Sequence, residues 1–200
     1  YMVYSIDNEK IKKLTATIGN KIYYGGSQSW YPSFLQRLSG CGATTASNLF
    51  ACIDPTPFAT KEQRLEIMQN MWLFVTPGIY GLDHVEDFAS GSNKFFEERS
   101  LTYECTYFKY PDDKKPSFDD SAQFVKTALS ENCPVAFLNL SNGAIKLLES
   151  HHWVTIVSFD DGTNIATIFD GSQKFDMDLK LWHDTTIRRG GFARYKNKKT

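Results

Sequence analysis

Apolar positions in the first half of the chain recur at the spacing of a helix. Leu65 and Met68 stand out from mainly polar neighbours at an interval of three, which predicts a helix over residues 61–74 with one buried face. Thr60 and Gln63 have the spacing of a capping box, which places the start of this helix. Similar patterns predict three further helices, at 41–52, at 83–98 with a loosened turn at 90–92, and directly after Ser117.

Most of the strand-like segments lie in the second half of the chain, where β-branched and aromatic residues gather. Strands are expected at 21–24, 101–110, 134–140, 153–159, 164–169 and 191–195. The step Asp161-Gly162 favours a tight turn, which joins two of these strands into a hairpin. Residues 25–40 are expected to form a loop and 179–182 a short helical turn. Because helices come first and an antiparallel meander follows, the fold class is expected to be α+β.

Length and composition favour a single domain that spans residues 1–200. The 42% apolar and 22% charged residues are typical of a folded protein with a hydrophobic core. The net charge of -1 offers no broad attraction for nucleic acid or an anionic membrane, so neither is expected as a partner. No run approaches the roughly eighteen apolar residues of a membrane span, and no signal peptide is visible. A cytoplasmic location is therefore expected.

Cys41 is the most informative residue of the chain. It lies between Gly40 and Gly42, which let the backbone bend sharply, and it begins the helix predicted at 41–52. A thiol in the first turn of a helix feels the positive end of the helix dipole, which favours the nucleophilic thiolate. The other cysteines lack such surroundings and form no C-x-x-C pair, so they are expected to be reduced core or surface thiols; they are Cys52, Cys105 and Cys133.

A histidine and an aspartate follow Cys41 at the edges of later strands. His152 opens the strand 153–159, and Asp170 ends the strand 164–169. Counting outward from the turn between them places residue 152 opposite about residue 171, so the two side chains should lie close together. His151 competes for the same role, but neighbouring side chains on a strand face opposite ways, so only one of the two can face the cysteine.

These residues resemble the papain-like cysteine peptidase superfamily, and within it the double-glycine leader peptidase-like branch. The resemblance is carried by Gln36, Cys41-Gly42, His152-Trp153-Val154 and Asp170, and it covers roughly residues 22–195 in the order of elements. It implies a papain-like fold, in which a helical half with the nucleophile at a helix N-terminus packs on a twisted antiparallel sheet that carries the histidine and the aspartate. The chain departs from the family in having Ala43 where a proline is common, and in the spacing of Gln36 from Cys41.

The resemblance also implies a role for each residue. Cys41 would be the nucleophile, His152 the general base and then acid, and Asp170 the group that orients the imidazole. Gln36 would donate a hydrogen bond to the oxyanion together with the Cys41 backbone N–H, and Gln28 is the alternative donor. The reaction would be hydrolysis of a peptide or isopeptide bond in a peptide or protein substrate, without a metal or organic cofactor.

Two other functions are compatible with the same residues. An acyltransferase or transglutaminase-type enzyme would use the same triad with a different acceptor, and a peptide-binding module would keep the fold without turnover. The aromatic residues of the expected loop could line a substrate groove or pack the loop onto the core; they are Trp30, Tyr31 and Phe34. The remaining histidines, His84 and His183, are expected at the surface. The oligomeric state stays open.

Overall fold

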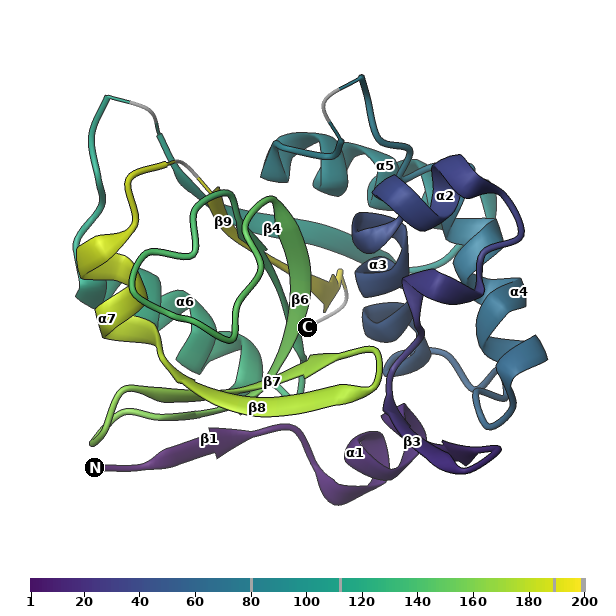
Figure 1. Cartoon of the computed structure of the whole chain (residues 1–200), viewed down its shortest axis with the longest axis horizontal. Coiled ribbons are helices and arrows are strands. Elements are labelled where there is room, and N and C mark those ends of the chain that lie inside the picture. Colours follow the sequence, from purple (N-terminus) through teal and green to yellow (C-terminus); the bar gives the residue numbers. More distant parts are fainter. Residues whose placement is uncertain (80, 112, 189, 199–200) are drawn as a thin grey trace.

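The computed structural model describes residues 1–79, 81–111, 113–188 and 190–198 (Figure 1). The helices are α1 (Asn8–Leu14), the 3₁₀ turn η1 (Gln28–Trp30), α2 (Phe34–Ser39), α3 (Cys41–Ala51), α4 (Lys61–Trp72), α5 (Val85–Glu98), α6 (Phe118–Ser130) and α7 (Leu179–Thr185). The strands are β1 (Val3–Ser5), β2 (Thr15–Ile18), β3 (Lys21–Tyr24), β4 (Tyr103–Tyr110), β5 (Val135–Asn139), β6 (His152–Asp160), β7 (Ile165–Asp170), β8 (Gln173–Asp178) and β9 (Gly190–Asn197). The fold belongs to the α+β class, as the sequence predicts.

The main sheet is antiparallel, but its strand order is not a simple meander. The order is β4-β9-β5-β6-β7-β8, and β1 pairs with the end of β6 that lies beyond β5. The prediction of a meander therefore holds for β5, β6, β7 and β8, but not for β9, which enters between β4 and β5. The strands β2 and β3 form a separate two-stranded sheet.

Helices cover both faces of the main sheet. Figure 1 shows α2 to α5 on one side of it and α6 and α7 on the other. All five residues of β5 are buried, which is expected for a strand that is covered on both faces. The helix α3 lies between α4 and β6, so its first residue reaches the boundary between the helical part and the sheet.

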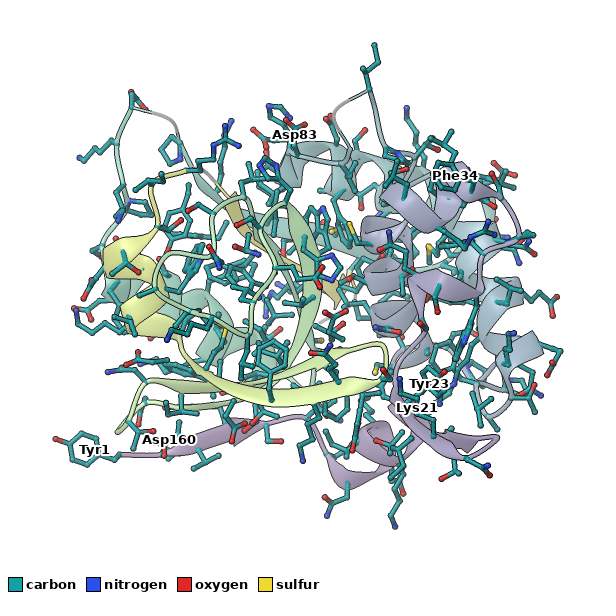
Figure 2. The ribbon with its side chains drawn as sticks, in the orientation of Figure 1. Tyr1, Lys21, Tyr23, Phe34, Asp83 and Asp160 are labelled. Carbon is teal, nitrogen blue, oxygen red and sulfur yellow. The ribbon has the colours of Figure 1, made fainter. Side chains whose placement is uncertain are left out.

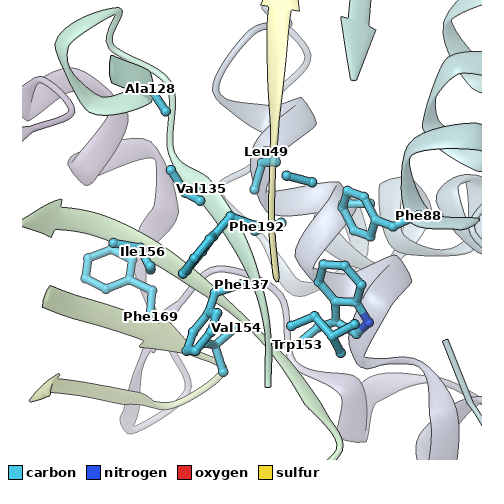
Figure 3. Close-up of a cluster of buried hydrophobic side chains, with 14 of the residues drawn as sticks. Leu49, Phe88, Ala128, Val135, Phe137, Trp153, Val154, Ile156, Phe169 and Phe192 are labelled. Atoms are coloured by element: carbon cyan, nitrogen blue, oxygen red, sulfur yellow. The ribbon is translucent and has the colours of Figure 1, made fainter. Parts of the chain in front are cut away.

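Aromatic side chains fill the core on both faces of the sheet. Phe137 of β5 stacks on Phe192 of β9 with a centroid distance of 5.1 Å. Near the start of β6, Trp153 stacks on Phe88 of α5 at 4.4 Å (Figure 3). Both Trp153 and Phe88 are buried, so the start of β6 is fixed against the helical part of the protein.

The helices predicted at 41–52, 61–74 and 83–98 are confirmed to within two residues at each end, the helix predicted after Ser117 begins at Phe118, and the capping box of Thr60 and Gln63 is present. One detail is wrong, since α5 continues unbroken through Ser90-Gly91-Ser92. A Cβ on Gly91 would lie 2.3 Å from the carbonyl oxygen of Phe74. The glycine therefore allows close packing and does not loosen the helix. Among the described residues, none of the helices combines the length and the apolar character needed to cross a bilayer.

The expected loop at 25–40 is a wrong prediction over α2, and the elements α1, β1, β2 and β8 were not predicted. The helix α2 buries none of its residues, and Phe34 and Leu38 are 74% and 68% exposed. Without a buried face there is no amphipathic period for the sequence to show. The helix α1 is short and starts with a local cap, in which Asp7 accepts a hydrogen bond from the backbone N–H of Lys10 at 2.8 Å.

The prediction that His183 lies at the surface is also wrong. Its side chain is buried on α7, and Nδ1 lies 2.9 Å from the hydroxyl of Tyr110. Burial lowers the pKa of His183, and the positive charge of Lys115 acts in the same direction. This histidine is therefore part of the core on the face of the sheet that α7 covers. His84, by contrast, is the partly exposed N-cap residue of α5.

Candidate active site

Cys41 is the first residue of α3, as the sequence predicts. The preceding helix α2 ends at Ser39, and Gly40 is the N-cap residue between the two helices. The thiol is partly exposed, whereas the ten residues of α3 that follow it are buried. Cys41 is thus the one position of this helix at which a side chain can meet both the protein interior and the solvent.

The glycines beside Cys41 serve packing and do not create a sharp bend. Gly40 has ordinary backbone angles, with φ of -84° and ψ of 7°. A Cβ at this position would lie 2.5 Å from the ring of Tyr31, and a Cβ on Gly42 would lie 2.5 Å from the side chain of Leu82. The expectation of special backbone geometry is therefore corrected. The two glycines allow the side chains of Tyr31 and Leu82 to pack closely against the N-terminus of α3.

His152 and Asp170 come together through the β6–β7 hairpin. At the turn end of the hairpin Asp160 pairs with Ile165, and at the open end Thr155 pairs with Phe169. The turn is thus centred one residue later than the sequence analysis expects, and a bulge between Ile156 and Ser158 shifts the register back by one. The bulge offsets only half of the change, because a turn centred one residue later moves each pairing by two; extending the ladder from Thr155 and Phe169 places residue 152 opposite 172, one beyond the expected 171.

The His152 ring makes a direct contact with Asp170. Its Nε2 lies 3.0 Å from Oδ2 of the carboxylate, which is hydrogen-bond distance. Burial lowers the pKa of His152, but the hydrogen bonds to Asp170 and Cys41, together with the charges of these groups, outweigh it and raise the pKa to about 10. Because Asp170 occupies Nε2, Nδ1 is the ring atom left for the Cys41 thiol.

His151 is directed elsewhere. Its φ of 57° lies in the left-handed region, so the extended backbone of β6 begins only at the next residue, His152. The ring is exposed, and its Nε2 accepts a hydrogen bond from Nη1 of Arg188 at 2.7 Å. The choice of His152 over His151 as the partner of Asp170 therefore agrees with the observed geometry.

Asn48, in the second half of α3, connects this helix to the main sheet and to the segment that follows β3. The Asn48 amide donates to Oγ1 of Thr155 at 3.1 Å, and its Oδ1 accepts from the backbone N–H of Gly26 at 2.8 Å. Asn48 and Thr155 are both buried. Their hydrogen bonds fix the distance between the helix that carries Cys41 and the strand that carries His152.

Cys41, His152 and Asp170 line the same small cavity. Among the described residues that line it, Gln28 is present and Gln36 is not. The Nε2 of Gln28 donates to the carbonyl oxygen of Arg37 at 2.7 Å. Gln36 lies partly buried on α2. The roles of both glutamines at an oxyanion stay predictions, and the position of Gln28 favours the alternative donor.

The chain matches no protein-family model and no curated protein.

Among the residues that the structure describes, no group of three or more His, Cys, Asp or Glu side chains could hold a metal ion. The four cysteines are free thiols, and Cys52 and Cys105 are buried. Burial raises the pKa of Cys52 to about 12 and also raises the pKa values of Cys105 and Cys133. Raised pKa values disfavour the thiolate, so these three cysteines are poor nucleophiles at neutral pH.

Arg64 holds backbone segments beside the site, and no pattern in the sequence predicts this role. Its side chain is fully buried on α4. The guanidinium donates to four backbone carbonyl oxygens, those of Phe58, Leu14, Gly25 and Lys13. Burial lowers its pKa to about 10, so it remains charged at neutral pH. A lone arginine within a helix gives no sequence signal of this kind, because its acceptors are backbone atoms of distant segments.

The segment Tyr24–Gly26 is a strap between the two halves of the site. The backbone N–H of Tyr24 donates to the carbonyl oxygen of Gly171 at 2.6 Å, next to Asp170. Gly25 is held by Arg64, and Gly26 is held by Asn48. The strap therefore connects the turn that carries Asp170 to the helices α3 and α4.

The raised pKa of His152 predicts a pH-dependent stability. The pKa of His152 is about 10 in the folded protein, against 6.5 for an ordinary histidine, so its protonated ring stabilises the fold fully below pH 6.5. This contribution is lost as the pH rises toward about 10. Urea unfolding of the wild type and of His152→Gln at several pH values measures it, with the exposed His151→Gln as control. The stability difference between wild type and His152→Gln should shrink across this window, and a constant difference would contradict the assignment.

Proposed function

We propose that this chain is a thiol-dependent hydrolase of the papain-like type, which cleaves peptide or isopeptide bonds with Cys41, His152 and Asp170. The observation that carries the proposal is the hydrogen bond between the His152 ring and the Asp170 carboxylate, at a small cavity that Cys41 at the N-terminus of α3 also lines. A cysteine nucleophile needs a base within reach, and that base needs a group to orient it. Cys41 supplies the nucleophile, His152 the base and Asp170 the orienting group.

The chemistry follows from the positions of the protons. The Cys41 thiolate attacks the carbonyl carbon of the substrate, and His152 donates its proton to the leaving amine as the C–N bond breaks. The product of this step is a thioester on Cys41. Neutral His152 then removes a proton from water, the resulting hydroxide displaces the thiolate, and the acid product leaves. Asp170 accepts the hydrogen bond of Nε2–H throughout and keeps Nδ1 directed at the reacting atoms.

Iodoacetamide labelling tests the nucleophile. Cys41 is expected to be the most reactive thiol near neutral pH, since it lies at a helix N-terminus beside a protonated imidazole. Burial raises the pKa values of the other three thiols, which disfavours their thiolate forms. Mass-spectrometric mapping of native protein measures the order of labelling. Faster labelling of Cys52, Cys105 or Cys133 would refute the assignment.

The same experiment with a peptide library separates the three candidate functions. Labelling of Cys41 together with hydrolysis supports the hydrolase. Labelling with transfer to an added amine, and without hydrolysis, favours the acyltransferase. Labelling without turnover on any peptide favours the binding module.

A comparison of the two adjacent histidines tests the base. His152→Ala should slow the alkylation of Cys41 at about pH 6 by at least roughly tenfold, because the imidazolium that stabilises the thiolate is lost. His151→Ala should change the rate little, because this ring contacts Arg188. Iodoacetamide rates for the two variants give the answer. If His151→Ala had the larger effect, the assignment of His152 would be wrong.

A further inference from the structure

A pocket of about 590 Å³ lies at the opposite end of α3 from Cys41. Its lining includes Lys10 of α1 and Cys52, which is the C-cap residue of α3, about 16 Å from Cys41 along the helix axis. In the view of Figures 1 and 2, α1 lies at the lower edge of the molecule, whereas Phe34 at the start of α2 and Asp83 lie at the upper edge. This α1 pocket is therefore separate from the small cavity of Cys41, and the described linings of the two have no residue in common.

The α1 pocket exists because β9 is longer than one of its neighbours. The ladder between β5 and β9 ends at Ala193, whereas β9 runs on to Asn197 with β4 as its partner. Cys133 precedes β5, and its thiol donates to the carbonyl oxygen of Tyr195 at 3.1 Å. The space beside the end of β9 is then bounded by α1, by the residues after α3 and by those after α6.

Lys10 gives this pocket a positive charge at a fixed place. Its Nζ donates to the carbonyl oxygen of Asn132 at 2.6 Å, and an ammonium group has three donors, so this bond leaves others for a ligand. Burial raises the pKa values of Cys52 and Cys133, and the charge of Lys10 acts in the opposite direction on both. Lys10 therefore lies near both thiols of the lining.

The rest of the described lining favours an anion with an apolar body. Lys196 adds a second basic residue, and the acid of this lining, Glu131, is paired with Nη1 of Arg194 at 2.9 Å. Ile53 and Tyr103 supply partly buried apolar surface. The volume lies within the range of pockets that hold small organic molecules, roughly 300–1,000 Å³.

We propose that the α1 pocket binds a small organic carboxylate, with the carboxylate group on Lys10 and an aliphatic or aromatic body against Ile53 and Tyr103. The charge of Lys10 selects the acid over a neutral molecule of the same shape, and the apolar walls remove the body of the ligand from water. The site makes no use of Cys41, so this inference does not rest on the proposed function.

Octanoate and naphthoate are the probes that test the proposal, with the neutral amides of the same two acids as controls. Calorimetric titration of the wild type is expected to show saturable binding of at least one acid, about tenfold tighter than its amide, the scale of a hydrogen bond to a charged group. Lys10→Met should lose this preference. Lys12→Met is the matched control, because Lys12 is exposed on the same helix and is not among the described residues that line the pocket. Circular dichroism shows whether each variant is folded.

Alkylation of Cys133 in the wild type locates the bound probe. N-ethylmaleimide is used at a pH of about 8.5, because the raised pKa of this thiol makes it slow at neutral pH. The bound acid should slow the alkylation of Cys133 several-fold and leave that of Cys41 unchanged, and this result decides the matter if Lys10→Met does not fold. Saturable binding of neither acid, equal binding of acid and amide, an unchanged preference in folded Lys10→Met, or an unprotected Cys133 overturns the proposal. None of these outcomes alters the iodoacetamide test of the proposed function.

Discussion

Replacing Cys41 by alanine is expected to abolish peptide hydrolysis, with a loss of at least about 10⁴-fold in rate. The acyl intermediate is bonded to this sulfur, so no other side chain of the cavity can replace it. A fluorogenic peptide library, with turnover followed for wild type and variant under the same conditions, measures the effect.

Cys133→Ala is the control for this variant, since it removes a partly buried thiol whose Sγ donates to the carbonyl oxygen of Tyr195, outside the cavity. It should keep nearly full activity. Comparable hydrolysis by wild type and Cys41→Ala would show that the triad is not the catalytic centre.

Replacing Arg64 by methionine is expected to lower the free energy of unfolding by about 3–5 kcal/mol, the scale for removing one partner from a buried charged network. The side chain volume is similar, but the carbonyl oxygens that the guanidinium satisfies lose their donor. Urea unfolding at neutral pH measures the loss. Arg64→Lys should also destabilise, because an ammonium cannot reach acceptors spread over a planar fork.

Arg37→Met is the matched control for Arg64. Arg37 also donates to backbone carbonyl oxygens, those of Tyr31 and Pro32, but it is exposed. Its replacement should cost less than about 1 kcal/mol. Equal losses for the two arginines would show that Arg64 does not organise the strap. If Arg64→Met remains stable but Cys41 loses its reactivity, the arginine acts on the site more than on the fold.

The parts of the fold that could be predicted are those with a local signal. The helix α4 has its capping box and one apolar side, and β5 has a continuous apolar run. The tip of α3 could be placed because Gly40 and Gly42 surround Cys41. Asp170 could be placed next to His152 because an antiparallel hairpin converts sequence distance into register.

The parts that could not be predicted depend on distant segments. The helix α2 has no fully buried residue, so its sequence resembles a loop. The burial of His183 is set by packing against Tyr110, which lies in a strand far away in the sequence. The insertion of β9 between β4 and β5 is a choice among strand orders that no local pattern encodes. The hydrogen bonds of Arg64 go to backbone carbonyl oxygens of three other segments.

The central place of β9 bears on how this protein is made. A ribosome delivers β4 and β5 long before Gly190–Asn197, yet both strands need β9 as their neighbour. Until it arrives, each presents an unpaired edge that can pair with another chain. The buried aromatic ring of Phe192 is also missing from its place against Phe137 during this time. The growing chain therefore cannot complete its sheet, or the surface on which α3 carries its thiol, until nearly all of the described sequence has been synthesised, and contacts between such distant segments favour slow folding.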